Sequence, residues 1–387
     1  MDVYYFDNAA SSWPKPPGVA EAMVEAVTKY GANPGRGSHK LAVEASRAIF
    51  RTRKKLATLF GIRNPNDIAF ALNTTAALNT AILGYVKEGD HVVCTAVEHN
   101  SVRRPLEWLK ETRNVRVTYV ETSESGQLDP IQVKRAVEPQ TRLIVVNHSS
   151  NLLGSIVPLA EIGDIARSCG AALLVDAAQS AGVLPIDVEA MGVDMLAFPG
   201  HKALYGPQGT GGLYISPKLE VAPLVVGGTG SQSEAVLQPT VRPDRYESGT
   251  QNTPGIAGLG AGVDFVLHET IATIHNREWG LTQRMMEGLM RLDGIRLLGP
   301  KLGEPRTGIV AFTAEGIGSA EISFVLDQHF RIAVRAGYHC TPLAHRVAGT
   351  EATGAVRASV GAFTTDDQVD YFVDAVGQIV REYRGKA

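Results

Sequence analysis

The sequence is poor in cysteine and aromatic residues, and it has no long apolar run. Its three cysteines, Cys94, Cys169 and Cys340, lie far apart and match neither a disulfide framework nor the paired spacing of a metal site. No run reaches the roughly 20 apolar residues that a membrane-spanning helix needs, and residues 1–7 lack the features of a signal peptide. We therefore expect a cytoplasmic protein without a membrane partner, in a compartment where thiols stay reduced.

An excess of charge of one sign is also missing. Lysine and arginine number 37 against 40 aspartate and glutamate residues, which gives a formal net charge of -3. Such a balance provides no electrostatic footprint for nucleic acid. The basic run Arg51–Lys55 is typical of a solvated helix face. We therefore expect no nucleic-acid partner.

The apolar residues that are present alternate regularly with helical stretches. Hydrophobic residues make up 44% of 387 residues, enough for two or three domains. From residue 68 onward, short apolar runs alternate with helical patterns, which is typical of βαβ units in a mainly parallel sheet. We predict an N-terminal arm over residues 1–15, a large α/β domain over 16–260 and a smaller α+β domain over 261–387.

A lysine occupies an unusual position in the stretch from residue 194 to residue 214. After an apolar strand, the chain presents His201 and Lys202 and then passes through a glycine-rich loop to a second strand. A single loop lysine is more often simply solvated. However, the preceding strand ends in Asp176, and open α/β sheets bind ligands at this edge. A pyridoxal phosphate (PLP) enzyme needs this pair, because the lysine binds the cofactor covalently and the carboxylate keeps its ring nitrogen protonated.

Five short motifs in order resemble the cysteine desulfurases of the class V aminotransferase fold, particularly the branch with selenocysteine lyases. They are Asp176-Ala-Ala-Gln179, Gly200-His-Lys202 with Tyr205-Gly-Pro207, Gly249-Thr-Gln-Asn-Thr253, Arg335-Ala-Gly-Tyr-His-Cys340 and Arg357-Ala-Ser359. The resemblance covers nearly the whole chain, from Phe6-Asp-Asn-Ala-Ala10 to the last helix. It implies a fold-type I PLP-dependent transferase that forms a homodimer, with a mainly parallel seven-stranded sheet in the large domain.

A phosphate site is predicted where Thr74 and Thr75 open a helix after a buried strand. Backbone amides at a helix start bind phosphate, although simple capping by threonine is the alternative. The resemblance implies that Thr75 and His201 bind the phosphate and that Thr250 comes from the other subunit. Pro199 stands where many relatives carry a serine ligand, which removes one donor.

The ring of the cofactor is expected to contact three further side chains. His99 follows a strand end, where an imidazole can stack on the ring and transfer a proton near neutral pH; a lone histidine is more often structural. The resemblance favours that role for His99, assigns Gln179 to the phenolic oxygen and makes Asn151 a second polar contact. The alternative for Asn151, in a polar cluster that ends in Gly154, is an ordinary turn.

Cys340 differs from the other two cysteines by its loop and its neighbours. Cys94, in an apolar strand, and Cys169, near a helix end, are typical of buried structural cysteines. Cys340 lies beside His339 and Arg335, which favour a thiolate. A metal site with His345 lacks a fourth ligand at suitable spacing. The resemblance makes Cys340 the catalytic cysteine.

The substrate carboxylate is expected to bind Arg357, because a guanidinium offers a bidentate fork. The resemblance assigns Arg357 this role, with Arg36, Asn8 and Asn151 as further substrate contacts. Gly35 stands where some selenocysteine-handling relatives have a histidine.

The resemblance thus implies conversion of L-cysteine to L-alanine. Lys202 abstracts the Cα proton, Cys340 takes the sulfur as a persulfide, His99 helps to return the proton, and the thiol of an acceptor protein receives the sulfur. Two alternatives stay open. One is another class V PLP enzyme, such as a selenocysteine lyase, cysteine β-lyase, epimerase or aminotransferase, in which Cys340 is not catalytic. The other is a non-catalytic α/β binding protein.

Overall fold

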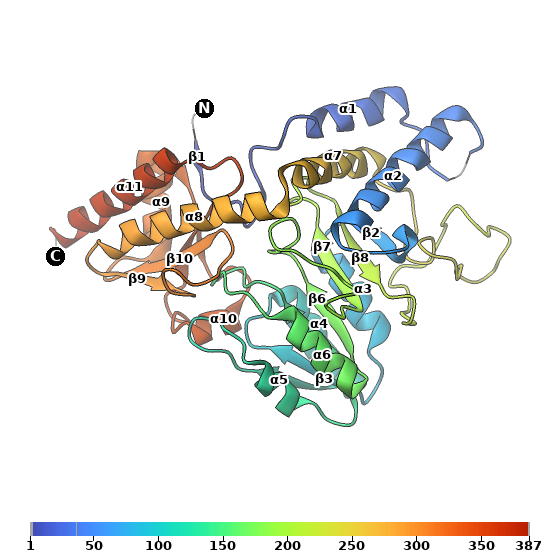
Figure 1. The fold of residues 1–387 in the computed structure, drawn as a ribbon, viewed down its shortest axis with the longest axis horizontal. Coiled ribbons are helices and arrows are strands. Elements are labelled where there is room, and N and C mark those ends of the chain that lie inside the picture. The colour runs from blue at the N-terminus through green and yellow to red at the C-terminus, as the bar shows by residue number, and fades with distance from the viewer. Residues whose placement is uncertain (1–2, 36, 386–387) are drawn as a thin grey trace.

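The computed structural model describes residues 3–35 and 37–385, which form sheets of seven, four and two strands with helices packed against them (Figure 1). The helices are α1 (Val19–Lys29), α2 (Lys40–Leu59), the 3-10 turn η1 (Pro65–Asp67), α3 (Thr74–Tyr85), α4 (Asn100–Arg113), α5 (Pro130–Ala136), α6 (Leu159–Cys169), α7 (Thr253–Glu269), α8 (Ile271–Met290), α9 (Ser319–Phe330), α10 (Pro342–Val347) and α11 (Asp366–Arg384). The strands are β1 (Tyr4–Tyr5), β2 (Ile68–Ala71), β3 (His91–Thr95), β4 (Arg116–Val120), β5 (Thr141–Asn147), β6 (Ala172–Asp176), β7 (Met195–Pro199), β8 (Gly211–Ile215), β9 (Ile295–Leu298), β10 (Ile309–Ala314), β11 (Ile332–Ala333), β12 (Arg335–Gly337) and β13 (Ala355–Ser359).

The central sheet has the mainly parallel, seven-stranded form that the resemblance implied. Within the described residues its strand order is β2-β8-β7-β6-β5-β3-β4, and β8 alone runs antiparallel to its neighbours. Strands β6, β7 and β8 are buried along their whole length, with an apolar cluster on each side of the sheet. Because both faces are covered, these strands are apolar runs rather than alternating patterns. The α/β prediction for this region is confirmed.

A smaller antiparallel sheet lies in the C-terminal part of the chain. Among the described residues its strand order is β12-β13-β10-β9. Helices α8, α9 and α11 pack around it and enclose a third apolar cluster, which contains Phe312 and Phe372. The boundary predicted near residue 260 falls within α7, which packs on α1 and α2, and this boundary stays a prediction.

The N-terminal arm crosses to the C-terminal part of the molecule. Strand β1 pairs in parallel with β11, and Phe6 is fully buried in the third apolar cluster. Further along, the Ser12 amide donates to the carbonyl of His201, and its hydroxyl donates to the carbonyl of Lys202. The arm therefore joins the small sheet to the loop that carries the predicted cofactor lysine.

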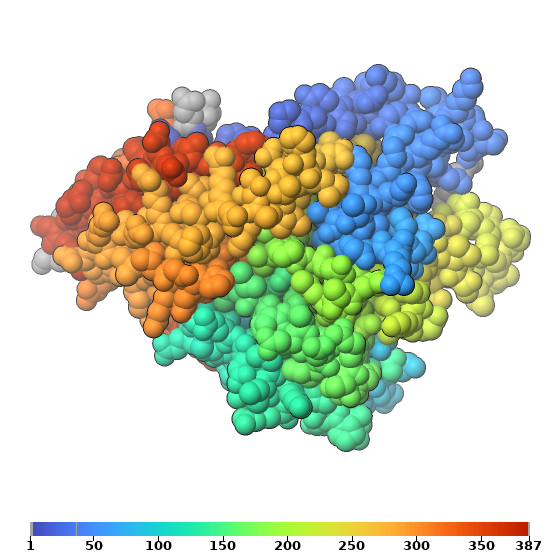
Figure 2. All heavy atoms as spheres, viewed as in Figure 1, coloured from blue at the N-terminus to red at the C-terminus, as the bar shows by residue number. Residues whose placement is uncertain are grey.

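Two local expectations, for Arg53 and Cys169, were wrong. Arg53, expected on a solvated helix face, is buried and forms a paired salt bridge with Glu247, because the opposite segment supplies a carboxylate that the α2 pattern alone cannot reveal. Cys169 is exposed at the end of α6, whereas Cys94 is buried as expected. Residues 229–247 contain no helix or strand, and this segment stands out from the surface at the right of the molecule (Figures 1 and 2).

Candidate active site

A cavity of about 230 Å³ opens at the carboxyl edge of the central sheet. Most of the predicted site residues line it, although they come from six different segments. These are Thr74, Thr75, His99, Asn151, Asp176, Gln179, His201, Lys202 and Arg357. The fold thus brings together residues that are up to 283 positions apart in the sequence, from Thr74 to Arg357.

Lys202 and Asp176 are positioned by two neighbouring strands. Strands β6 and β7 pair in parallel, so that Asp176 and the loop after Pro199 reach the same edge of the sheet. Burial in this cavity lowers the pKa of Lys202 to about 8, while the charge of Asp176 opposes the shift. Burial also raises the pKa of Asp176, against the effects of the Ala178 amide and of Lys202. A lysine with this pKa has a substantial unprotonated fraction near neutral pH, as a nucleophile or general base requires.

The N-terminus of α3 provides an anion site at one end of the cavity. Asn73 caps the helix by accepting a hydrogen bond from the Ala76 amide, and Thr74 and Thr75 occupy the first turn. The Thr75 hydroxyl lies 2.7 Å from that of Ser101. Burial lowers the pKa of His201 to about 4, and the charge of Lys202 contributes. Amides and hydroxyls around a helix start suit a phosphate group.

His99 caps α4 and faces the cavity as a neutral ring. Its Nδ1 accepts a hydrogen bond from the Ser101 amide at 3.0 Å, which leaves the proton on Nε2. Burial lowers the pKa of His99 to about 4, with a contribution from the charge of Lys202. The structure therefore presents a ring with one N–H donor, in the place where sequence reasoning put a ring-side histidine.

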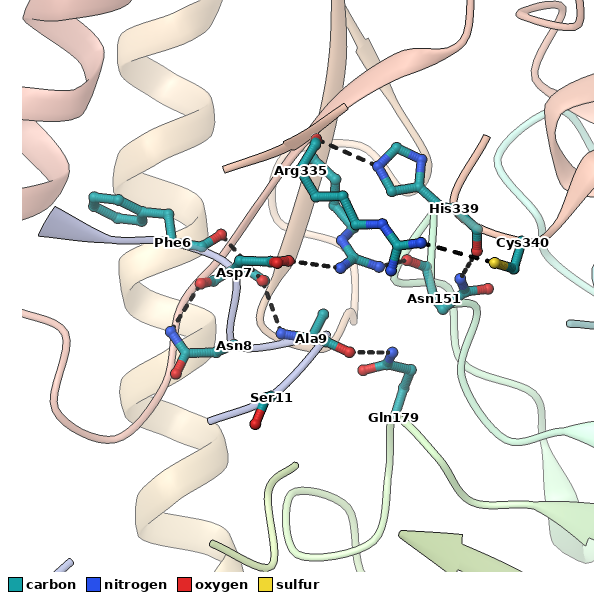
Figure 3. Close-up of polar contacts among 12 residues, drawn as sticks. Phe6, Asp7, Asn8, Ala9, Ser11, Asn151, Gln179, Arg335, His339 and Cys340 are labelled. Carbon is teal, nitrogen blue, oxygen red and sulfur yellow. Dashed lines mark hydrogen bonds and ion pairs between the residues drawn. The ribbon is translucent and has the colours of Figure 1, made fainter. Parts of the chain in front are cut away.

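Asn151 joins the cavity to the loop that carries Cys340. Its Nδ2 donates to the carbonyl of His339 at 2.7 Å, while its own backbone carbonyl accepts from Arg357 Nη1 at 2.9 Å. Gln179 is also held by the protein, since its Nε2 donates to the Ala9 carbonyl at 3.0 Å. Figure 3 shows the Gln179 amide beside Ala9 of the N-terminal arm and the Asn151 amide beside His339 and Cys340.

Cys340 lies outside the cavity, but its neighbours Arg335 and His339 line the cavity wall. The thiol is exposed, and Arg335 Nη2 lies 3.7 Å from its Sγ (Figure 3). His339 and Cys340 both adopt left-handed backbone conformations, with φ of 51° and 58°. Non-glycine residues in this region are uncommon and persist where surrounding contacts fix them. Here the Asn100 amide donates to the Cys340 carbonyl at 2.8 Å.

Besides Cys340, two predicted residues within the described part of the chain do not line this cavity. Asn8 donates to the Ser359 carbonyl at 3.0 Å and faces a smaller neighbouring cavity. Thr250 lies on a different surface hollow, together with Glu247 and Gln251. Arg36 lies outside the described residues.

Sequence reasoning missed several polar groups of the site. Asn147 ends β5 and lines the cavity, and the rule that identified Asp176 at a strand end applies to it equally. Asp7 pairs with Arg357, and its position in the arm motif Phe6-Asp-Asn-Ala-Ala10 could have indicated that it belongs to the site. Ser101, which bonds both Thr75 and His99, had no signal beyond its position in the first turn of α4.

The cavity contains polar atoms that lack partners within residues 3–35 and 37–385. They are Asn147 Oδ1, Asn151 Oδ1, His201 Nδ1 and Arg357 Nε. Buried polar groups are normally hydrogen-bonded, so unpaired ones that line a cavity indicate a ligand. Together with the Lys202–Asp176 pair and the α3 amides, this set fits the aldehyde, pyridine nitrogen and phosphate of PLP.

The comparisons with known proteins all point to the same family. The family model Aminotransferase class-V matches residues 4–372. A probable cysteine desulfurase of Methanothermobacter thermautotrophicus is 37% identical over 388 residues, covering 98% of this chain and 95% of its own length.

Solved structures show the same likeness. The apo structure of a cysteine desulfurase from Thermococcus onnurineus has a TM-score of 0.92 and 34% identity, covering 98% of this chain and 95% of that one. A cysteine desulfurase from Escherichia coli has a TM-score of 0.89 and 26% identity, covering 98% of this chain and 95% of that one.

Among the helices within residues 3–35 and 37–385, none combines the length and the apolar character that a membrane span requires.

Proposed function

The chain belongs to the class V aminotransferase family, and on that premise we propose that it is a PLP-dependent cysteine desulfurase. The reaction would convert L-cysteine to L-alanine and leave the sulfur on Cys340 as a persulfide. One observation carries the proposal: a single cavity holds Lys202 and Asp176, and its wall continues through Arg335 and His339 to an exposed thiol.

The residues of the large sheet would hold the cofactor and move the proton. When bound, PLP supplies an electron sink for the substrate. Lys202 would hold it covalently and then act as the base at the substrate Cα, for which the lowered pKa of about 8 is suitable. Asp176 would face the pyridine nitrogen, the first turn of α3 and His201 would bind the phosphate, and Gln179 would contact the phenolic oxygen.

Arg357 and Cys340 would act on opposite ends of the substrate. Arg357 would bind the α-carboxylate, with Asn151 beside it. The Cys340 thiolate, stabilised by the nearby Arg335, would form a bond to the substrate sulfur. The Cβ–S bond then breaks with its electron pair left on carbon, and a proton delivered through Nε2 of His99 completes alanine.

The proposal includes a homodimer and a sulfur acceptor. Val225, Val226, Val236 and Leu237 are largely exposed on the segment near Thr250, and an apolar patch of this kind supports a subunit interface. In such a dimer Thr250 would complete the partner's phosphate site. An exposed Cys340 would meet the thiol of an acceptor protein, and we place the enzyme in the cytoplasm, where thiols stay reduced.

The decisive experiment quantifies alanine and sulfide after incubation of the PLP-loaded protein with L-cysteine and a reductant. We expect equal amounts of both. Cys340→Ala should keep the bound chromophore, lose the persulfide and reduce turnover by at least about a hundredfold, because the nucleophile is gone. Cys169→Ala is the matched control, since Cys169 is also an exposed thiol, and it should leave turnover unchanged.

Two results would contradict this proposal. Pyruvate and ammonia without alanine would identify a β-lyase, and a persulfide that still forms in the Cys340→Ala variant would remove the role of this cysteine.

A further inference from the structure

Residues 6–9 of the N-terminal arm are clamped at the end of β13, where Asp7 forms an isolated parallel bridge with Ser359. The Phe6 carbonyl accepts a hydrogen bond from the Ser359 amide at 2.7 Å, and the Ala9 amide donates to the Ser359 hydroxyl at 2.9 Å. Arg357 precedes Ser359 by two positions, so both side chains point to the same face of the strand. Asp7, between the two clamped residues, is thereby directed at the guanidinium of Arg357.

The guanidinium of Arg357 needs a counter-ion in this place. Its side chain is 1% exposed, and the cavity also contains the cations of Lys202 and Arg335. A buried charge without a partner is strongly destabilising. In the described part of the chain, Asp7 is the one carboxylate paired with Arg357, with Oδ1 2.9 Å from Nη2.

The ion pair with Asp7 uses only some of the N–H donors of the Arg357 guanidinium. Arg357 Nη1 donates to the Asn151 carbonyl, and Nη2 donates to Asp7. Nε is buried, and among residues 3–35 and 37–385 it has no partner. A carboxylate binds a guanidinium most strongly through two parallel N–H donors, such as Nε and Nη2. Nη2 carries two N–H donors, and a ligand carboxylate bound through Nε and Nη2 would lie beside the Asp7 carboxylate, whose like charge opposes it.

Asp7 and Arg357 differ in their access to water. The Asp7 side chain is 23% exposed, whereas that of Arg357 is 1% exposed. A displaced Asp7 carboxylate can therefore be hydrated, while Arg357 has to keep an anion beside it. The exchange of one carboxylate for another leaves the buried cation neutralised throughout.

We propose that Asp7 acts as a stand-in for the substrate carboxylate: its carboxylate pairs with Arg357 and holds it in place before a substrate binds. The carboxylate of the substrate then displaces Asp7 from Arg357. Asp7 is then a positioning residue that limits the affinity of the site for carboxylates and keeps selection for them through Arg357. The identity of the substrate as an amino acid rests on the function proposed above; the competition between carboxylates does not.

Asp7→Asn tests this exchange with the smallest change of shape. The amide oxygen still accepts a hydrogen bond from Nη2 and keeps Arg357 aimed, but the competing charge is gone. We expect the KM for L-cysteine to fall about tenfold, equivalent to about 1.4 kcal/mol. We expect kcat to change less than about threefold, because the chemical steps do not use Asp7.

A pair of matched ligands separates the carboxylate from the rest of the substrate. 3-Mercaptopropionate has the thiol and the carboxylate but no amine, and cysteamine has the thiol and the amine but no carboxylate. By titration calorimetry, Asp7→Asn should bind 3-mercaptopropionate about tenfold more tightly and cysteamine with unchanged affinity. Asp7→Glu, which keeps the charge, should stay within about threefold of the wild type for both ligands.

Ser11→Ala controls for general loosening of the arm. Ser11 belongs to the same segment and donates to the His201 carbonyl, but it does not contact Arg357. The Ser11→Ala variant should bind 3-mercaptopropionate with the same affinity as the wild type. If Asp7→Asn does not fold, Asp7→Ser carries the same expectation, because it also removes the charge.

An unchanged or weaker affinity of Asp7→Asn for 3-mercaptopropionate would overturn the proposal and make Asp7 a purely structural residue. Equal tightening of cysteamine would overturn it as well, because the effect would not depend on a carboxylate. If the wild type forms no alanine but 3-mercaptopropionate responds as expected, the desulfurase function fails and the stand-in role of Asp7 holds.

Discussion

The two halves of the candidate site are built in opposite ways. Lys202 and Asp176 lie at the ends of adjacent, fully buried strands, so the sheet fixes their positions. Cys340 is exposed on a loop and is held by single hydrogen bonds to its backbone, such as that from Asn100. The difference indicates that the rigid edge carries the groups that need a dry, fixed place. In the proposed function, the loop carries the thiol that has to reach both the cavity and a sulfur acceptor.

Each half carries a different energetic cost. In the buried half the cost is electrostatic, since loss of water lowers the pKa of Lys202 to about 8 and that of His201 to about 4. In the exposed half it is conformational, because left-handed backbone at His339 and Cys340 costs about 1–3 kcal/mol per residue. Variants in the two halves should therefore fail in distinguishable ways.

Lys202→Ala should produce the largest effect. It removes both the covalent attachment point and the base, so we expect loss of the bound chromophore and a fall in kcat of at least about a thousandfold. Lys15→Met is a matched control, because burial lowers the pKa of Lys15 to about 8 as well, but Lys15 lies outside the cavity. Lys15 Nζ donates to the His201 carbonyl at 3.1 Å, so a modest loss is compatible with the prediction, whereas a loss as large as that of Lys202→Ala would contradict the special place of Lys202 in the cavity.

His345→Ala should affect only the exposed half of the site, which is the loop that carries Cys340. His345 is fully buried, with Nδ1 2.8 Å from the Thr350 hydroxyl and its ring stacked on that of His339. Without this support the strained loop should lose its fixed geometry, and persulfide formation on Cys340 should slow about tenfold while the cofactor spectrum stays the same. His329→Ala, an exposed histidine on α9, is the control. A changed spectrum in the His345 variant would contradict the separation of the two halves.

Glu278→Gln should have the smallest effect, on the pH dependence of stability. Burial raises the pKa of Glu278 to about 8 from a usual value near 4.5, so between these pH values the folded state holds a proton that the unfolded state has lost. The wild type should therefore lose stability as pH rises from about 5 to 8, at up to about 1.4 kcal/mol per pH unit from this group.

Removal of that carboxyl should flatten the dependence, which urea unfolding at several pH values measures. Glu287→Gln, on the exposed side of the same helix, should keep the wild-type slope. Identical slopes for the wild type and the Glu278 variant would refute the assignment of this pH dependence to the buried interior.

The sequence predicted the buried half of the site better than the exposed half. Apolar runs identify buried strands, and groups that follow parallel strands, such as Asp176 and Lys202, necessarily share one edge of the sheet. Predicting that Cys340 would lie close to this edge required the family resemblance, because no local pattern relates its loop to the central sheet.

The remaining differences have long-range causes. Arg53 is buried because it pairs with Glu247, which is 194 residues away in the sequence. The sequence pattern of a helix cannot reveal so distant a partner. The pairing of Asp7 with Arg357 spans 350 residues in the same way. Strand β13 is not evident from the sequence, because its five residues, all buried, have no alternation and include the charged Arg357.

The clamped arm also has a consequence for synthesis. Asp7 is synthesised 350 residues before Arg357, an interval of roughly 20–70 s at typical translation rates. During that interval the central sheet can form, but the arm has neither β11 nor β13 to pair with. The nascent chain can therefore form the strand ends that carry Asp176 and Lys202 well before Arg357 is made, so the proposed carboxylate-binding residue would be among the last parts of the site to be completed.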